Sequence, residues 1–251
     1  MLLRRVMEQV RAQNWFAVGV DLVIVVLGVF LGIQMGNWNE SRLEKAQSVT
    51  FTRLLEHDLH ADAARYRDVA AYYTSVRDNA VRALGALERE APLSDEALII
   101  AAYRASQVAL VPINRSTFDE LVSTGRINLI TNPGLRAMAI EHFGFNYIAS
   151  AAADGRQSSY RNLLRETLPP EAHRAAREHC GDVDSAEIVA LDYPCSLGLS
   201  AATIHHSANA LRAERAIPAS LRHRSNELDI QIRDLITRAA QLDRASSAEE
   251  R

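Results

Sequence analysis

The sequence predicts an all-α protein in which one N-terminal transmembrane helix is followed by a long-helix antiparallel bundle. Three observations support this prediction: a long apolar run near the amino end, helical spacing of apolar residues through much of the remaining chain, and almost no strand pattern. The part after the apolar run is polar and long enough to bury the core of one domain.

The apolar run extends from Trp15 to Met35 and contains a single charged residue, Asp21. A hydrocarbon core about 30 Å thick requires roughly 20 apolar residues at a rise of about 1.5 Å each, so this run is long enough to span a bilayer. A cleaved signal has a shorter apolar core and a pair of small residues before the cleavage site, which this run lacks. We therefore predict an uncleaved membrane anchor over residues 15–36. The alternatives are a cleaved signal peptide and a buried helix of a soluble protein.

Basic residues near the two ends of the span predict its orientation. They are Arg4, Arg5 and Arg11 before the span, and Arg42 and Lys45 after it. Because the end richer in Lys and Arg stays inside, residues 1–14 are predicted to be a cytoplasmic juxtamembrane segment. Residues 37–245 then form an extracytoplasmic helical domain, which lies in the periplasm if the membrane is a bacterial inner membrane. Residues 246–251 are predicted to be a disordered tail.

Small residues recur every four positions within the span, at Gly28, Gly32 and Gly36. This spacing allows two helix backbones to approach closely, and Asp21 falls on nearly the same face because it lies seven residues before Gly28. One hypothesis is therefore a self-associating helix with Asp21 in the interface. The alternative is that these glycines are ordinary span residues and that Asp21 is protonated or reaches the wet interface.

Two tryptophans bracket the apolar run, Trp15 at its start and Trp38 just after its end. Tryptophan prefers the headgroup level, where its ring is in an apolar setting and its N–H finds a partner. Both are predicted to be interface anchors, and the bilayer is the predicted partner of this segment.

The span and its exit resemble a family of uncharacterised bacterial single-span membrane proteins, classed as a domain of unknown function. The resemblance rests on a Gly-x-acidic start, an aliphatic run, a glutamine and an Asn-Trp-Asn-Glu exit with a following basic residue. Those positions here are Gly19, Asp21, Gly28, Gln34, Asn37, Trp38, Asn39, Glu40 and Arg42. A second, weaker stretch of likeness covers residues 116–136. The resemblance implies a membrane protein with a helical domain and brings no known activity or catalytic residue.

The first helix after the span is predicted to run from Arg42 to Glu90, either as a separate helix or as a continuation of the span. Its apolar residues follow steps of three and four, with one skipped turn at Asp62. They are Phe51, Leu55, Leu59, Tyr66, Val69, Tyr73, Val76, Ala80, Leu84 and Leu87.

Capping residues then predict where the shorter helices begin. Ser94 should cap a helix that reaches about Val108, and Thr117 with Glu120 fits a capping box before a helix that Gly125 ends. Residues 126–130 are ambiguous between a short strand and an irregular crossing. Asn132 with Pro133 should start a helix reaching about Ala153 or further.

The carboxy-terminal half is predicted to contain two further helices with an irregular stretch between them. Residues 158–167 read as a helix that Pro169 and Pro170 interrupt, and residues 180–200 look irregular. The last helix carries apolar residues from Leu221 to Leu242, with Pro218 in its first turn or at a kink.

The only two cysteines, Cys180 and Cys195, flank the irregular stretch. In an oxidising periplasm they would form a disulfide. The alternatives are two free thiols, or a metal site that also uses His179, His205 and His206, although tight zinc-ligand spacing is absent. The pair His57 and His60 is predicted to lie on a solvated helix face, and no metal site or cofactor is predicted.

The most loop-like polar cluster is the candidate site for a small anion or peptide. We single out Arg115, Thr117, Glu120 and Arg126, because a helix N-terminus with nearby arginines suits a carboxylate or phosphate. The alternative is a buried interhelical connection whose polar groups cap helix ends. Asn114, Ser116, Ser123, Thr124 and Asn128 belong to the same cluster.

The net charge of the chain and the absence of known catalytic motifs limit the classes of function that the sequence supports. The net charge of −3 comes without a basic patch, so no nucleic-acid partner is predicted. Nucleophile-elbow, phosphate-loop and dinucleotide motifs are absent, so no catalytic residue is assigned. The predicted function is a membrane-anchored binding, sensory or interaction module, with an unidentified protein partner. The alternatives are a membrane-tethered enzyme with a fold-assembled site and a structural envelope component.

Overall fold

The computed structural model describes residues 15–182 and 191–246, and the prediction of an all-α fold is confirmed. Every regular element in these two ranges is a helix, and neither range contains a strand. The predicted juxtamembrane segment 1–14 and residues 247–251 of the predicted tail lie outside the described residues. The side chains of Trp15 and Asp21, which belong to α2, lie outside them as well.

Helix α2 extends over Trp15–Leu87 and therefore contains both the apolar run and the first predicted helix after it. The chain divides into two compact units after Thr52. In the first unit, α2 carries the apolar run, whose most apolar 18-residue window has a mean hydropathy of 1.6 with none of it buried. This helix is long and apolar enough to cross a membrane.

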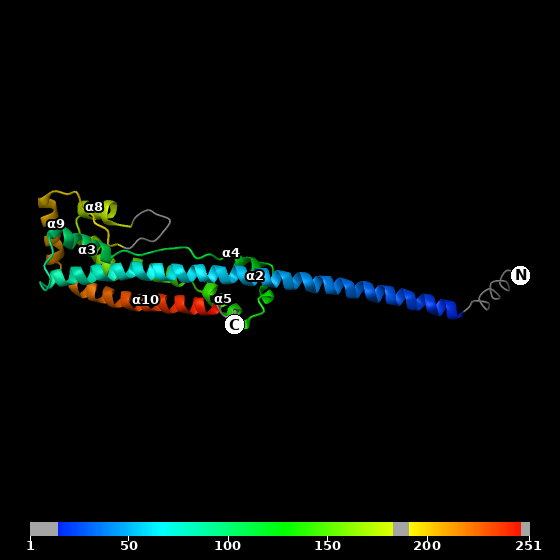
Figure 1. Ribbon diagram of the computed structural model, residues 1–251. Coiled ribbons are helices and arrows are strands. Elements are labelled where there is room, and N and C mark those ends of the chain that lie inside the picture. Colours follow the sequence, from blue (N-terminus) through cyan, green and yellow to red (C-terminus); the bar gives the residue numbers. More distant parts are fainter. Residues whose placement is uncertain (1–14, 183–190, 247–251) are drawn as a thin grey trace. The chain divides into compact units, whose positions relative to one another are not determined.

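The second unit contains the rest of α2 and the helices that pack on it. Helix α10, Ala216–Ser246, runs antiparallel to this part of α2 (Figure 1). Ion pairs follow the two helices in order: Arg67 with Asp243, Arg77 with Asp229, and Glu88, just after α2 ends, with Arg222. From one pair to the next, the residue number on the α2 side rises while the residue number on α10 falls. This order is that of two antiparallel helices, as the sequence predicted.

Shorter helices complete the second unit and begin mostly at side-chain caps. They are α3 (Asp95–Ala105), α4 (Ser116–Ser123), the 3₁₀ helix η1 (Ile127–Leu129), α5 (Pro133–Gly144), α6 (Tyr147–Arg156), α7 (Ser159–Thr167), α8 (Pro170–Cys180) and α9 (Ala201–Ala213). The predicted caps Ser94 and Asn132 are confirmed, since Ser94 Oγ accepts from the Ala97 N–H and Asn132 Oδ1 from the Gly134 N–H. Gly125 has a positive φ of 69° just after α4 ends, as a helix stop requires.

Several predicted boundaries were wrong, each for a local reason. The capping box does not form, because α4 starts at Ser116 and Thr117 lies buried inside it. Residues 127–129 form a 3₁₀ helix rather than a strand. The helix that starts at Pro133 stops at Gly144, and Asn146 caps a separate helix, its Oδ1 accepting from the Ala149 N–H.

Two helices were not predicted. Pro170 occupies the first turn of α8, where its missing N–H costs nothing, so the proline pair starts a helix as well as ending one. Helix α9 begins after Ser200, whose Oγ accepts from the Thr203 N–H.

The core of the second unit is centred on α3. Its buried face includes Leu98, Ile99 and Ala102, and it packs with buried residues of α7, α8, α9 and α10. Tyr160 is fully buried there, and its hydroxyl donates to the Ala102 carbonyl at 2.7 Å. Pairing this hydroxyl avoids the cost of an unsatisfied buried polar group.

Candidate functional site

The structure does not bring the four predicted anion-site residues to one cavity. The guanidinium of Arg115 donates to Asp119 Oδ1 at 3.0 Å and to the Phe143 carbonyl at 2.6 Å. Thr117 is buried, whereas Glu120 and Arg126 are exposed. None of the four lines a cavity described below, and Arg115 has protein partners for its charge, so the anion site stays a prediction.

A buried polar network lies where α2, α5 and the segment before α4 meet. The Oδ2 atom of Asp62 lies 2.9 Å from His142 Nε2, and Oδ1 accepts from Arg65 Nη1 at 2.7 Å. Asn114 donates its side-chain amide to Asp58 Oδ1 at 2.9 Å and its backbone N–H to Asp62 Oδ1 at 3.3 Å. Asp62 and His142 are almost completely buried, so this network joins helices and offers no opening to a ligand.

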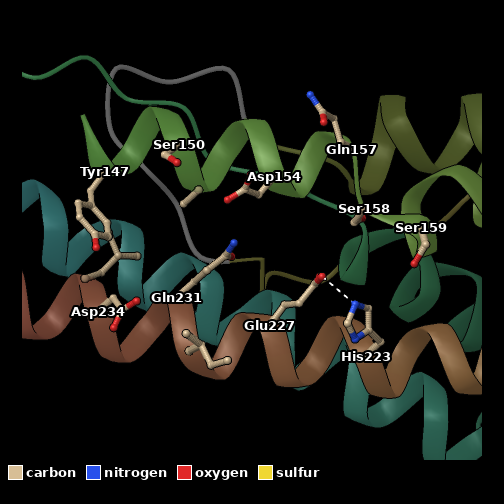
Figure 2. A pocket seen from close by; sticks show the side chains of 13 residues that line it. Tyr147, Ser150, Asp154, Gln157, Ser158, Ser159, His223, Glu227, Gln231 and Asp234 are labelled. Atoms are coloured by element: carbon tan, nitrogen blue, oxygen red, sulfur yellow. Dashed lines mark ion pairs between the residues drawn. The ribbon is translucent and has the colours of Figure 1, made fainter. Parts of the chain in front are cut away.

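A cavity of about 580 Å³ lies between α6 and α10 (Figure 2). Figure 2 shows side chains of both helices flanking this space. From α6 and the start of α7 come Tyr147, Ser150, Ala151, Asp154, Gln157, Ser158 and Ser159; from α10 come His223, Glu227, Ile230, Gln231, Asp234 and Leu235. We call it the α6–α10 cavity, and its volume falls within the range of small-ligand sites.

Acceptor groups dominate the lining of the α6–α10 cavity. It contains three carboxylates, Asp154, Glu227 and Asp234, and one imidazole, His223. Glu227 Oε1 lies 3.1 Å from His223 Nε2, and Gln231 Oε1 is buried with no hydrogen-bond partner among the described residues. Such a lining favours a ligand or protein segment that brings hydrogen-bond donors or positive charge.

A buried arginine supports the inner end of the cavity. Arg224 is 1% exposed and lies 3.7 Å from Glu227 Oε2, measured from Nη1, while its Nη2 donates to the Gln107 carbonyl at 3.3 Å. Burial lowers the pKa of Arg224 below its usual value. Gly155 on α6 leaves room for this guanidinium, because a Cβ there would lie 3.2 Å from Arg224 Nη2 and 2.5 Å from Val108 Cγ1.

The α6–α10 cavity is lined by serine hydroxyls and by the imidazole of His223, but these groups do not hydrogen-bond to one another among the described residues. No serine hydroxyl in the described part of the chain hydrogen-bonds to His223, and Ser158 Oγ accepts from the Arg161 N–H as the cap of α7. A nucleophile activated by an adjacent base is therefore not assembled there. The sequence did not reveal this cavity; Glu227 and Asp234 lie seven residues apart on one helix, but nothing in the sequence pairs that face with α6.

No group of three or more His, Cys, Asp and Glu in the two described ranges is arranged to hold a metal ion. His60 Nδ1 lies 3.3 Å from Asp243 Oδ1, and His57 Nδ1 lies 3.8 Å from Asp58 Oδ1. Cys180 and Cys195 form a disulfide with their Cα atoms 5.4 Å apart, which excludes the alternatives of free thiols and metal ligation in this structure. Buried Arg104 donates to the Cys180 carbonyl at 3.1 Å and to the Tyr193 carbonyl at 2.9 Å, fixing both sides of the bridge.

The predicted packing glycines lie on an open surface of α2. A Cβ added at Gly28, Gly32 or Gly36 would meet nothing within 4 Å, so a second helix has access to these positions. Trp38 is exposed, with the Arg42 guanidinium 6.0 Å from its ring centroid.

Comparisons of the chain with protein-family models, with curated proteins and with solved structures find no match. The resemblance of Gly19–Arg42 to a single-span family therefore stays a prediction.

Proposed function

We propose that this chain is a single-pass protein of a bacterial inner membrane whose helical domain lies in the periplasm and binds a partner. The observation that carries the proposal is the apolar part of α2, whose side chains from Leu22 to Met35 are all exposed. Exposing so many large apolar side chains to water is unfavourable, and a bilayer would cover them. The excess of basic residues before this segment favours a cytoplasmic amino end.

The binding role rests on the α6–α10 cavity. It lies in a domain with a well-packed core, and its lining offers carboxylates and the unpaired Gln231 oxygen to a ligand. The exposed side chain of Ile230 at its mouth adds an apolar contact. A partner segment that carries Lys or Arg beside an apolar residue would fit this lining, and the domain would then act as a sensory or interaction module.

Topology is tested by fusing alkaline phosphatase after Arg251 in the full chain. This reporter folds only outside the cytoplasm, so we expect an active fusion and an inactive cytoplasmic reporter at the same position. Activity of the cytoplasmic reporter alone would reverse the orientation.

Binding at the cavity is tested by placing a photo-crosslinking amino acid at Ile230 in cells that make the full chain. The matched control is Ile236, which is exposed to a similar extent on the same helix but does not line the cavity. We expect a discrete crosslinked species from position 230 and none from position 236. Crosslinks from both positions, or from neither, would contradict a partner seated in the cavity.

A further inference from the structure

A second cavity, lined mainly by residues of α7 and α8, is rich in cations. It has two adjoining parts, of about 280 Å³ and 350 Å³, which share Arg165 of α7 and His173 and Arg177 of α8. The first part also contains Arg161 and Asp182, and the second also contains Arg174, Leu168 and Pro170. We call this the α7–α8 cavity.

Within the described residues, few carboxylates pair with the arginines of the α7–α8 cavity. Arg161 Nη1 donates to the Ser106 carbonyl, while its Nε is buried with no hydrogen-bond partner among the described residues. Arg165 makes no hydrogen bond or ion pair within residues 15–182 and 191–246. The Nη2 atom of Arg177 lies 3.9 Å from the neighbouring Glu178 Oε1, which is the limit of an ion pair. Arginine pairs strongly with oxyanions, so unpaired guanidiniums that share a cavity are a ready binding set.

The electrostatic balance of the cavity is positive. Among the residues that the structure describes, Asp182 is the only carboxylate in the lining, and it accepts a hydrogen bond from the Tyr72 hydroxyl. Three arginines in the first part against this one aspartate leave two positive charges, which matches a doubly charged anion.

The cations of the cavity also repel one another, which disfavours their protonated forms. Burial, followed by the charge of Arg165, lowers the pKa of Arg161. Burial lowers the pKa of His173, and Arg165, Arg177 and Arg161 lower it further. His173 packs edge-on against Tyr103, with 5.6 Å between the ring centroids, so its ring is held at the cavity wall. A bound anion would relieve the repulsion among these groups.

We infer that the α7–α8 cavity binds the phosphate of a small phosphomonoester, held by Arg161, Arg165 and Arg177. The three guanidiniums supply forked donors that match phosphate oxygens, and the two net charges balance a phosphate dianion. The second part of the cavity, where Leu168 and Pro170 add apolar surface, receives the organic group. This site is separate from the α6–α10 cavity and does not depend on the orientation of the protein in the membrane.

The test is calorimetric titration of the detergent-solubilised full chain with glycerol 3-phosphate. Succinate, a dicarboxylate of the same charge, and dioctanoyl phosphatidic acid, a phosphomonoester with a lipid tail, are titrated in parallel. We expect saturable binding of a phosphomonoester and weaker binding of succinate. Preference for glycerol 3-phosphate would assign a soluble ligand, and preference for the phosphatidic acid would assign a lipid headgroup; both support the inference.

Variants of matched charge locate the site. Arg165→Gln removes one of the cavity cations that has no described protein partner, so the fold should be retained, and we expect affinity to fall by about tenfold or more. The control is Arg233→Gln, which makes the same charge change on the exposed face of α10, outside the cavity. We expect Arg233→Gln to bind as the parent does.

A second readout follows the imidazole of His173 by NMR in the same preparation. A phosphate dianion beside it stabilises the imidazolium, so ligand should raise the pKa of His173. Absence of saturable phosphomonoester binding, binding of succinate as tight as that of the phosphomonoesters, or equal affinities of Arg165→Gln and Arg233→Gln would overturn the inference. A failed topology or crosslinking experiment would leave these outcomes unchanged.

Discussion

Asp62 and His142 lie 80 residues apart in the sequence, yet Asp62 Oδ2 and His142 Nε2 are 2.9 Å apart in the core. Asp62 occupies the one skipped turn in the apolar face of α2. Although Asp62 interrupts the apolar pattern of α2, its side chain is buried with that of His142 and does not face solvent. The pair fixes α5 against α2, while Asn114 attaches the segment before α4 to the same carboxylate.

Replacement of His142 by alanine should destabilise the domain strongly. The variant leaves a buried carboxylate with fewer partners and creates a void, so we expect a loss of about 3 kcal/mol or more in the free energy of unfolding. His57→Ala is the control, because His57 is exposed on α2 and should change stability by less than about 0.5 kcal/mol. Urea unfolding followed by circular dichroism measures the free energy of unfolding of both variants. Equal losses in the two variants would contradict a stabilising role of the buried Asp62–His142 pair.

Stability at alkaline pH should depend on Tyr66, whose ring lies 5.7 Å from that of His142. Burial, followed by the charge of Asp62, raises the pKa of Tyr66 to about 12, from 10.0 for a free tyrosine. Between these two values the unfolded chain loses the phenolic proton while the folded chain keeps it. Stability should therefore fall as pH rises through this window, by up to about 1.4 kcal/mol per pH unit.

The Tyr66→Phe variant has no phenol to ionise at this position. Its stability should fall less steeply between about pH 10 and pH 12 than that of the parent, by the same linkage. Urea unfolding at several alkaline pH values gives the two slopes, and identical slopes would show that Tyr66 does not control this loss.

Substitution of Gly155 by alanine should be costly, although alanine normally favours a helix. The new Cβ would lie 2.5 Å from Val108 Cγ1 and close to the buried Arg224 guanidinium. Overpacking of this kind costs about 1–3 kcal/mol. Gly144→Ala is the matched control, because a Cβ there meets nothing within 4 Å. Thermal unfolding should separate the two variants, and similar melting temperatures would contradict close packing at Gly155.

Reduction of the Cys180–Cys195 disulfide should lower stability by about 3 kcal/mol, the loop-closure value for a bridge spanning about 15 residues. A Cys180→Ser, Cys195→Ser double variant should show the same loss without reductant and no further loss with it. Mass spectrometry of protein isolated from membranes under alkylating conditions would establish whether the bridge forms in cells. Alkylation of both thiols would remove this support for an oxidising compartment.

Self-association through the span is tested with Gly28→Ile combined with Gly32→Ile. If these positions pack against a second helix, the larger side chains should separate the backbones and cost on the order of 1–2 kcal/mol of association. Asp21→Leu should weaken association further if Asp21 shares that face. A two-hybrid assay of residues 1–45 in a bacterial inner membrane measures all three, and unchanged signals would leave the glycines as ordinary span residues.

Local signals in the sequence were sufficient wherever a short stretch of chain decides the structure. The apolar length of residues 15–36, the three- and four-residue spacing from Leu55 to Ala80, and the caps Ser94 and Asn132 all depend on near neighbours. The α5–α6 break was missed because Gly144 and Asn146 compete with a continuing apolar pattern, and only packing decides between a break and one long helix. The start of α8 was missed because a proline that ends one helix can also begin the next.

By itself the sequence determined the all-α class, the apolar helix near the amino end and the pair of cysteines available for a bridge, since composition and periodicity carry that information. Only the tertiary structure decided which polar residues share a cavity. Asp154 shares a cavity with Glu227 and Asp234 because α6 packs on α10, and Arg161 of α7 shares another with Arg177 of α8. At the predicted anion site, the structure also shows that the Arg115 guanidinium is engaged by Asp119 and the Phe143 carbonyl. The sequence shows which side chains are charged. Whether a charge is neutralised depends on contacts between residues far apart along the chain, which only the tertiary structure determines.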